Sequence, residues 1–489
     1  MIKILLILIL FSSSSVYSER QFADLHNHMF GHEAWDGGWY HGLVEGPEHE
    51  ALTPCSGNED FFGDHGVVIH PWLVKIIFKS QDAGRHGKQG YPNYVTWPRW
   101  DTVIHQQMWE GHLKQAWKSG LRLMIVSFYG NQVICKLMNN KSRYNDCDDM
   151  NAVDRQFDAY EKFLQGHDEN NKMLPLRSTW VVHASTLEEA KKGIKEGKLV
   201  VIPSIEVSNL FPLNKGPWRE QLDKYYKRGI RTIQIVHQFN NLFAGAAIHE
   251  KILKVGQFFT NYELFAEKNG FNQLGLTTAG KELIKEMMKK KMLIDVAHLS
   301  EVGMNDVVKL TTSDGTYYPT YNSHTHVKSM MNNIRSSYEK SSPDDWLNYF
   351  KNAGGIVGLR TGADATFSFQ EGLVVPNDCD GTSKSFAQSF LYLDKKLKIP
   401  FAFGSDFNGF ATQMKPRFGK DSGCLKNQTN PLNKPFDETG YGHIGQIGNI
   451  LDDLQQFGVD VTPLAQSAQT FLEMWDKVNN PKKRNKVIR

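Results

Sequence analysis

Two histidines, His26 and His28, lie two positions apart near the start of the chain, within the segment Asp24 to His28. Side chains at positions i and i+2 of a strand point to the same face, so both imidazoles can reach one metal ion if 22–26 is a strand. A His-x-His pair also recurs by chance, and two polar surface histidines are the ordinary alternative. The pair therefore predicts metal binding only if later strands end in matching ligands.

Polar side chains of suitable chemistry also stand at the ends of later apolar segments. Together with the first pair, the set comprises His26, His28, Glu206, His237, His298, His324 and Asp406. Setting His237 aside, four imidazoles and two carboxylates are the inventory expected for two divalent metal ions that share a carboxylate and a bridging hydroxide. Each residue alone also fits a hydrogen-bonded strand end. Their joint occurrence favours a metal centre.

Eight short apolar segments are predicted as strands, and most are separated by segments of helical length. The predicted strands are 21–26, 121–127, 198–206, 229–237, 292–298, 317–324, 354–359 and 399–406. Short apolar strands that alternate with helices imply parallel pairing with both faces covered, and eight is the number that closes a barrel. A doubly wound open sheet is the alternative, disfavoured because no Gly-rich phosphate loop follows the first strand. We therefore predict an α/β fold, a (β/α)8 TIM-type barrel with the polar residues at its C-terminal face.

Residues 30–120 interrupt this pattern directly after the first strand. The segment is rich in Gly, His and Trp, lacks long periodic stretches and is too long for a connecting loop. Within it, the spacing of apolar residues predicts a helix over 101–120. We expect one domain over 19–489, in which 30–120 is an insertion that caps the mouth of the barrel.

The first 18 residues have the features of a secretory signal peptide, because a positively charged start precedes an apolar run and then small residues. We expect cleavage after Ser18 and a soluble mature chain that is secreted or periplasmic. No later run approaches the ~20 apolar residues that span a bilayer, which predicts no transmembrane segment. In a host that glycosylates, Asn140 and Asn427 begin acceptor sequences.

Export would also permit disulfides among the five cysteines of the chain. Cys135 with Cys147, and Cys379 with Cys424, are candidate pairs, but pairing cannot be deduced from spacing. The alternative is that some of these cysteines are free and buried.

The composition and overall charge limit the kinds of binding partner to be expected. The chain has 489 residues, of which 40% are hydrophobic and 22% charged, and its formal net charge is +3. Lys and Arg are dispersed along the chain rather than gathered in one patch. This distribution argues against nucleic acid as a partner.

Three segments together resemble the renal (membrane) dipeptidase family, which is M19-like and belongs to the amidohydrolase superfamily of metal-dependent (β/α)8 hydrolases. These are Gly275–Gly280 leading into Leu293–Ser300, then Ser323-His324, then Phe403–Gly409. The resemblance covers roughly 188–478 and the first strand, and leaves 30–120 unmatched.

The resemblance implies a role for each strand-end residue. His26 and His28 would bind one zinc ion, His298 and His324 the other, and Glu206 would bridge them. Asp406 matches the acid/base aspartate of the family, His237 a histidine that polarises the scissile carbonyl, and Arg335 the residue that holds the substrate carboxylate. The family usually has Asp at the position of His28, and Gly and Asp at the positions of Ser405 and Asn408.

The chemistry expected from these residues is metal-dependent hydrolysis of an amide or peptide bond in a small substrate, by attack of a metal-bound hydroxide. A dipeptide or another small molecule would be the substrate, and two divalent metal ions, expected to be zinc, the cofactors. A different hydrolase of the superfamily, acting on a lactone, an ester or a non-peptide amide, is the enzymatic alternative. A secreted binding protein with a structural metal site is the alternative from another class. Homodimer formation is left open.

Overall fold

The computed structural model describes residues 20–55, 90–92, 98–137, 143–167, 177–249, 251–332, 338–372, 375–419, 422, 424 and 435–487. Four sequence-based predictions lie outside the described residues: the signal peptide over 1–18, the glycosylation sites at Asn140 and Asn427, and the carboxylate-binding role of Arg335.

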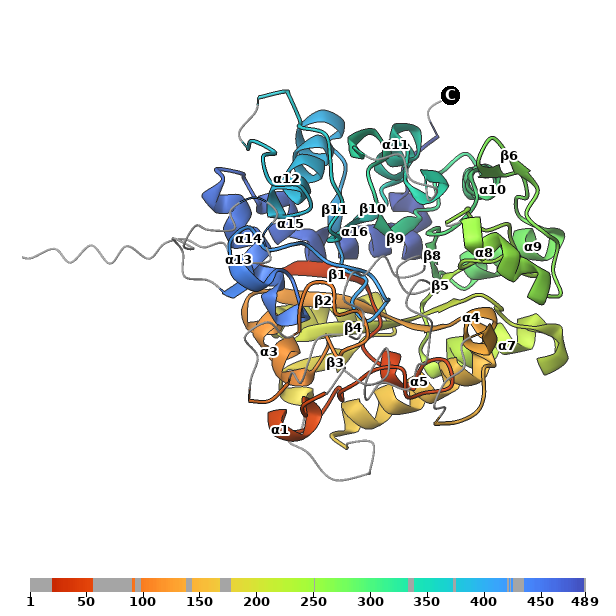
Figure 1. Ribbon diagram of the computed structural model, residues 1–489. Coiled ribbons are helices and arrows are strands. Elements are labelled where there is room, and N and C mark those ends of the chain that lie inside the picture. Colours follow the sequence, from red (N-terminus) through yellow and green to blue (C-terminus); the bar gives the residue numbers. More distant parts are fainter. Residues whose placement is uncertain are drawn as a thin grey trace, which may run out of the picture.

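Eight parallel strands form a closed barrel at the centre of the molecule (Figure 1). In barrel order they are β1 (Phe22–Asn27), β2 (Leu121–Gly130), β4 (Leu199–Val207), β5 (Thr232–Gln234), β8 (Leu293–Asp295), β9 (Tyr321–Thr325), β10 (Ile356–Arg360) and β11 (Phe401–Gly404). The barrel closes because β1 pairs with β2 on one side and with β11 on the other. An open doubly wound sheet would leave two free edges, so the predicted (β/α)8 class is confirmed and all eight predicted strands are present.

A ninth parallel strand, β3 (Val181–His183), pairs with the first residues of β4, whereas β5 pairs with its later residues. Since β2 pairs with β4 along almost its whole length, β3 and β5 share the other edge of β4. A short two-stranded hairpin, β6 (Glu267–Lys268) and β7 (Phe271–Asn272), lies apart from the barrel. Neither addition changes the eight-strand closure.

Burial on both faces explains the apolar strand sequences. Every residue of β2 and of β4 is buried, as expected for parallel strands that pack against side chains inside the barrel and helices outside it. A glycine permits the tightest approach between strands: a Cβ at Gly358 of β10 would lie 1.7 Å from the carbonyl oxygen of Ser323 in β9. Only glycine can occupy this position without displacing the strand that carries His324.

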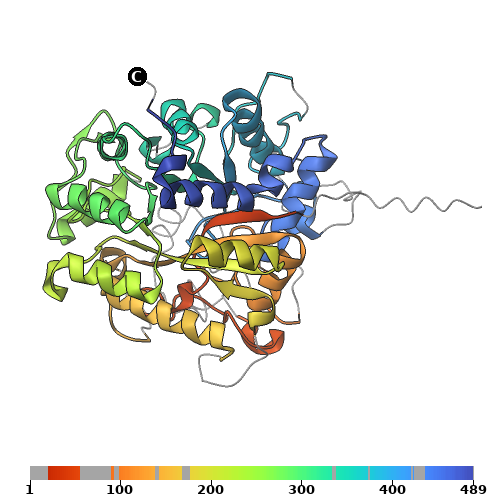
Figure 2. The ribbon, with the colours of Figure 1, turned by 180° about the vertical axis from the view of Figure 1, so that it is seen from behind.

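Helices surround the strands, as the views from opposite sides show (Figures 1 and 2). The longer ones are α3 (Glu110–Lys118), α5 (Asp149–Gln165), α6 (Leu187–Lys195), α7 (Trp218–Arg228), α9 (Thr278–Lys289), α10 (Glu301–Thr311), α11 (Asp344–Ala353), α12 (Ser383–Leu391), α14 (Ile447–Gln456) and α16 (Ser467–Asn479). The shorter ones are α1 (Glu48–Ala51), α4 (Gln132–Leu137), α8 (Lys251–Gly256), α13 (Pro435–Thr439) and α15 (Thr462–Ala465).

Helix ends follow from local chemistry. The Thr186 hydroxyl and the Glu189 carboxylate form a reciprocal capping box at the start of α6. Gly229, in the left-handed region at φ 107°, ends α7 and leads into β5. These signals fix where each helix returns the chain to the barrel.

Within the insertion, the predicted helix over 101–120 is only partly correct, because the helix α3 begins at Glu110. Before it, the Gln106 backbone N–H donates to the His41 carbonyl oxygen at 2.9 Å, and the Met108 N–H donates to the Gln106 side chain at 2.9 Å. The backbone groups that a helix would use are therefore bound to other parts of the insertion.

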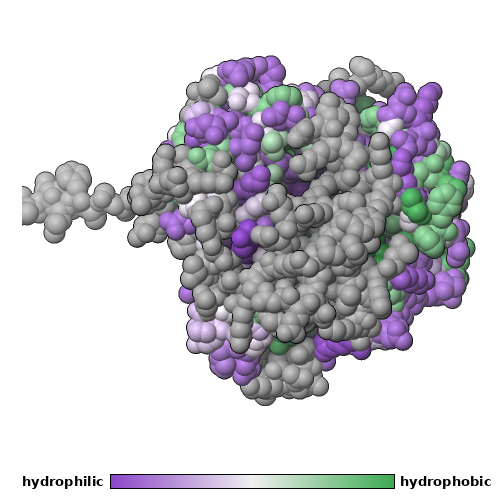
Figure 3. Space-filling view, in the orientation of Figure 1, coloured by the Kyte–Doolittle hydropathy of each residue, from purple (hydrophilic) through white to green (hydrophobic). Residues whose placement is uncertain are grey.

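Both candidate disulfides are formed, Cys135 with Cys147 and Cys379 with Cys424, and Cys55 is buried. Among the residues described, no helix combines the length and apolar character needed to cross a bilayer. On the face shown in Figure 3, hydrophobic side chains gather at the right, where Figure 1 labels α8. Val255, Phe258 and Phe259 are 58%, 69% and 63% exposed, so this apolar surface lies outside the barrel core.

Candidate metal centre

The strand-end residues predicted from the sequence meet at one rim of the barrel. His26 and Glu206 lie within the last residues of β1 and β4, His324 lies near the end of β9, and His28, His237, His298 and Asp406 follow β1, β5, β8 and β11 by one to three residues. The C-terminal ends of the strands of a (β/α)8 barrel form the face on which such enzymes carry their sites. We call these seven residues the strand-end centre.

Glu206 lies at the middle of the strand-end centre, and each of its two oxygens faces two imidazoles. Oε2 lies 3.0 Å from His26 Nε2 and 3.2 Å from His28 Nε2. Oε1 lies 3.3 Å from His298 Nε2 and 3.5 Å from His237 Nε2. One carboxylate therefore connects two histidine groups that are far apart in the sequence.

His324 completes the group on the side of His298, and their Nε2 atoms lie 2.8 Å apart. The ring of His324 also stacks on that of His26, with ring centroids 3.8 Å apart. His26, Glu206 and His324 are all buried, and their ligand atoms lie within 4.8 Å of one another. The same limit holds for His26, His28 and Asp406 and for Glu206, His237 and His298.

This donor set fits divalent cations. His26 Nε2 and Glu206 Oε2 are buried and face each other, yet neither makes a well-oriented hydrogen bond. Buried polar atoms normally have a partner, so two acceptors that converge in this way are suited to share a positive ion. Imidazole nitrogens with carboxylate oxygens are ligands that zinc prefers.

Several imidazoles are held by a partner on the ring nitrogen that points away from Glu206. His28 Nδ1 donates to the carbonyl oxygen of Ser127 in β2 at 2.9 Å, which orients the ring with Nε2 toward Glu206. His324 Nδ1 lies 2.9 Å from Ser323 Oγ, and His298 Nδ1 lies 2.6 Å from His249 Nε2. Such contacts fix the tautomer and orientation of metal-binding histidines.

Charge within the centre shifts the pKa of its members in opposite directions. Burial disfavours the charged form of His26, but the carboxylates of Glu206, Asp406 and Asp295 together outweigh it and raise the pKa of His26 to about 9. For His237, burial prevails over the attraction of Glu206 and lowers the pKa to about 3. The space between His26 and Glu206 thus favours a positive charge, whereas His237 is neutral at physiological pH.

Asp406 lies on the His28 side of the centre in a constrained backbone conformation, at φ 56°. Its Oδ1 is 3.3 Å from His28 Nε2, and its Oδ2 accepts a hydrogen bond from Arg360 at 3.1 Å. Burial would raise the pKa of Asp406, but the hydrogen bond with His28 and the charge of Arg360 hold it below the ordinary value. Asp406 is therefore ionised at neutral pH.

Ser405 and Asn408, which stand on either side of Asp406 in the sequence, have partners of their own. Ser405 Oγ donates to the buried carboxylate of Asp24 at 2.7 Å. Asn408 accepts from the Gln107 N–H at 3.0 Å and donates to the Gln106 side chain at 2.8 Å. Asn408 thus binds the insertion to the loop that carries Asp406.

The structure adds residues that the strand-end reasoning missed. Arg360 ends β10 and contacts Asp406, but the predicted strand stopped one residue earlier, at Leu359; extending the strand-end rule by one position would have found it. His249 and Ser127 act on the centre from other loops and strands, and no spacing in the sequence relates them to it. Arg335 lies outside the described residues.

Comparison with known proteins identifies a family. The family model described as membrane dipeptidase (peptidase family M19) matches residues 126–434, which is more than half of the chain. That range includes Glu206, His237, His298, His324 and Asp406 and begins after His26 and His28.

Curated relatives are described as dipeptidases. Dipeptidase verJ of Clonostachys rogersoniana is 24% identical over 220 residues, which are 44% of this chain and 48% of that protein. The uncharacterized dipeptidase C965.12 of Schizosaccharomyces pombe is 26% identical over 189 residues, 38% of this chain and 37% of that protein. The match thus spans half or less of the length of these relatives.

Solved structures are similar at lower identity. A metallopeptidase from Rhodobacter sphaeroides, liganded with a phosphinate mimic of the dipeptide L-Ala-D-Ala, has 15% identity and a TM-score of 0.47 over 75% of this chain and 89% of its own. The probable dipeptidase PvdM from Pseudomonas aeruginosa has 15% identity and a TM-score of 0.48 over 76% and 88%. On the extent of the family match, this chain belongs to the membrane dipeptidase family, peptidase family M19.

Proposed function

We propose that this protein is an exported, metal-dependent hydrolase that cleaves the amide or peptide bond of a small, dipeptide-like substrate. The observation that carries the proposal is the Glu206 carboxylate, each oxygen of which faces two imidazoles at the C-terminal rim of the barrel. Membership of the membrane dipeptidase family supports it. Relatives described as dipeptidases support the same reaction class.

Two divalent cations, proposed to be zinc, would be held by His26 and His28 on one side and by His298 and His324 on the other, with Glu206 shared. When bound, such a pair would supply the Lewis acidity that lets water ionise near neutral pH and attack a carbonyl carbon. The charge of Glu206 and the five imidazoles around it support this assignment.

Asp406 would take the proton from the attacking water and deliver it to the leaving amine. An ionised carboxylate within hydrogen-bond reach of the reacting atoms suits this role, and Asp406 Oδ1 faces the side of the centre that carries His28. His237 would donate a hydrogen bond to the scissile carbonyl oxygen. Its imidazole is neutral, and Nδ1 is buried without a hydrogen-bond partner among the described residues.

Three further parts of the proposal concern the rest of the chain. Arg335 would bind the substrate carboxylate, and residues 1–18 would direct export to the periplasm or the exterior. Residues 30–120 would cap the barrel mouth. The bonds of Gln106 and Gln107 to Asn408, two residues from Asp406, support such a cap.

A substrate screen tests the proposal. The full chain, loaded with Zn²⁺, is assayed against a panel of dipeptides, with N-acylated amino acids and lactones alongside. We expect dipeptides to be the best substrates as judged by kcat/KM. Exclusive turnover of lactones or N-acylated amino acids would assign a different amidohydrolase reaction to the site. Bound metal with no hydrolysis at all would favour a binding protein.

A further inference from the structure

Arg360 is a largely buried cation next to the strand-end centre, and none of the roles proposed above belongs to it. It is the last residue of β10, and its guanidinium donates from Nη1 to Asp406 Oδ2 at 3.1 Å. The side chains of Arg360 and Asp406 are only 13% and 11% exposed. An ion pair so little exposed is screened much less than one at the surface, and breaking it has a larger effect.

The backbone on both sides of this ion pair is fixed by hydrogen bonds. The Asp406 N–H donates to the His26 carbonyl oxygen at 2.8 Å. Next to Arg360, the Thr361 hydroxyl donates to Gln413 Oε1 at 2.6 Å, and Gln413 Nε2 donates to the Ser405 carbonyl oxygen at 2.7 Å. These bonds hold the ends of β10 and β11 together. None of them involves the Asp406 carboxylate, so they do not fix the torsion angles of that side chain.

Arg360 restricts that remaining freedom. With Oδ2 bound to the guanidinium, Asp406 presents Oδ1 to His28 at 3.3 Å and to His26 at 3.8 Å. Without Arg360, the carboxylate could rotate and bring both oxygens toward the same histidines. One oxygen held and the other presented is the arrangement that a proton carrier needs.

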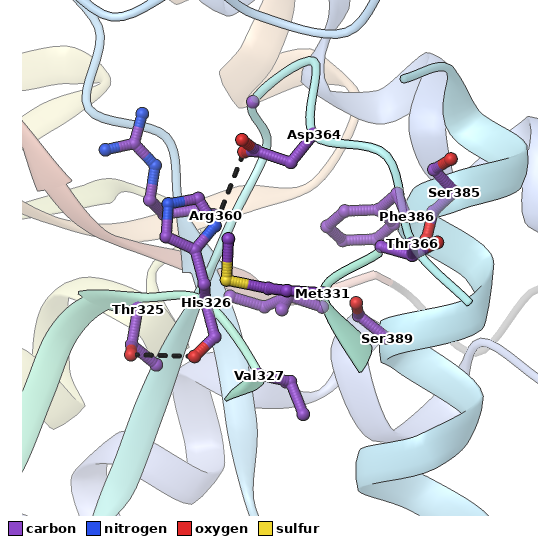
Figure 4. Close-up of a pocket in the computed structure, with 12 residues that line it drawn as sticks. Thr325, His326, Val327, Met331, Arg360, Asp364, Thr366, Ser385, Phe386 and Ser389 are labelled. Carbon is purple, nitrogen blue, oxygen red and sulfur yellow. Dashed lines mark hydrogen bonds and ion pairs between the residues drawn. The ribbon is translucent and has the colours of Figure 1, made fainter. Parts of the chain in front are cut away.

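Arg360 lines a small pocket between β9, β10 and α12. Figure 4 shows this pocket, with the guanidinium turned away from the wall that Phe386 and Ser385 form. Two other residues that line the pocket, His326 and Asp364, lie with Nδ1 of the imidazole 3.3 Å from the carboxylate. The stem of Arg360 thus forms part of the pocket wall while its charged head is directed to Asp406.

We propose that Arg360 is a positioning residue that fixes the orientation of the Asp406 carboxylate for proton transfer. The inference rests on the proposed hydrolase function and adds a residue to it. Arginine suits this role because its guanidinium keeps both its charge and its planar donor geometry when little exposed.

The test compares Arg360→Met and Arg360→Lys in the full, metal-loaded chain. For Arg360→Met we expect kcat to fall roughly ten- to hundredfold, the range seen when residues that orient a site are removed, with KM within about twofold and metal content unchanged. Arg360→Lys restores the charge without the planar fork, so it should recover part of the lost kcat. Bound metal is measured by elemental analysis.

Arg417→Met is the matched control. Arg417 is also a buried arginine paired with carboxylates, Asp437 at 2.6 Å and Asp453 at 3.2 Å, but outside the strand-end centre. This variant should lower the thermal stability and leave the kcat of the folded, metal-loaded chain unchanged.

The outcomes separate the inference from the proposed function. A wild-type chain that binds metal but hydrolyses nothing contradicts the proposed function, and the inference falls with it. An active wild-type chain with an unchanged kcat for Arg360→Met contradicts the inference alone. A rise confined to KM would also contradict the inference, because it would make Arg360 a substrate-binding residue. A loss of metal would contradict it as well, because it would make the role of Arg360 structural.

Discussion

Two groups of closely packed histidines among the described residues differ in what lies between their rings. In the strand-end centre, imidazoles surround the carboxylate of Glu206. In the second group, His112 of α3 stacks on His443 with ring centroids 3.7 Å apart, and among the described residues no carboxylate contacts either ring. We call the second group the stacked pair.

The electrostatic consequences are opposite. Beside Glu206, the pKa of His26 is raised to about 9 although burial opposes the charged form. In the stacked pair, burial lowers the pKa of His443 to about 3, and burial together with the charge of its neighbour lowers that of His112. A buried histidine cluster attracts a cation only where a carboxylate offsets the cost of burial, and this comparison separates a candidate metal centre from a packing contact.

Removing the shared carboxylate should have the largest effect. Glu206→Ala is expected to lose at least one metal ion per chain and to abolish hydrolysis, because the imidazoles then lack a counter-charge. Metal content by elemental analysis and turnover of the best dipeptide measure both effects. Asp453→Asn, a change in a buried carboxylate outside the centre, should keep its metal. Full metal occupancy in Glu206→Ala would contradict the assignment of Glu206 as the shared ligand.

A smaller effect is expected when Glu206 is kept and only the proposed proton carrier, Asp406, is changed. Asp406→Asn preserves the shape of the side chain, so metal content should stay unchanged while kcat falls roughly 10²- to 10⁴-fold. The readouts are kcat and metal content on the same preparation. Near-normal turnover would remove Asp406 from the mechanism.

The smallest effect is expected in the stacked pair, and it concerns stability rather than metal. The pKa of His443 is about 3 in the folded chain against an ordinary 6.5, so between these values the unfolded chain binds a proton that the folded chain does not. The contribution of neutral His443 is therefore complete above pH 6.5 and is lost as the pH falls toward 3, by at most about 1.4 kcal/mol per pH unit.

His443→Phe keeps an aromatic ring without the titration. The free energy of unfolding in urea, measured from pH 7 to pH 5, should depend less steeply on pH in this variant than in the wild type, with metal content unchanged. An equal pH dependence in both chains would show that His443 does not titrate as described, and a loss of metal would remove the distinction between the two histidine groups.

Much of the fold could be predicted because both the periodicity and the order of elements are local properties of the sequence. Alternating apolar strands and helices identified all eight barrel strands, and the rule that barrel sites lie at the C-terminal strand ends predicted that Glu206 and the histidines would converge. What depends on contacts between distant segments could not be predicted. The bond between His298 and His249, and the anchoring of Gln106 on Asn408, are not encoded in any spacing.

The errors have physical causes of the same kind. Arg360 was missed because the apolar pattern of β10 ends at Leu359, although the strand continues for one polar residue that an ion pair with Asp406 stabilises. The helix predicted over 101–120 begins late because Gln106 and Met108 give their backbone bonds to other partners. In both places a tertiary contact prevails over the local pattern.

Metal-dependent hydrolysis is tested most directly by titrating the metal-free chain with Zn²⁺ and measuring bound metal and dipeptide hydrolysis in parallel. We expect no hydrolysis without metal, and activity that rises as the sites fill toward two ions per chain. Hydrolysis by the metal-free chain, or two bound ions without hydrolysis of any dipeptide, would contradict this expectation.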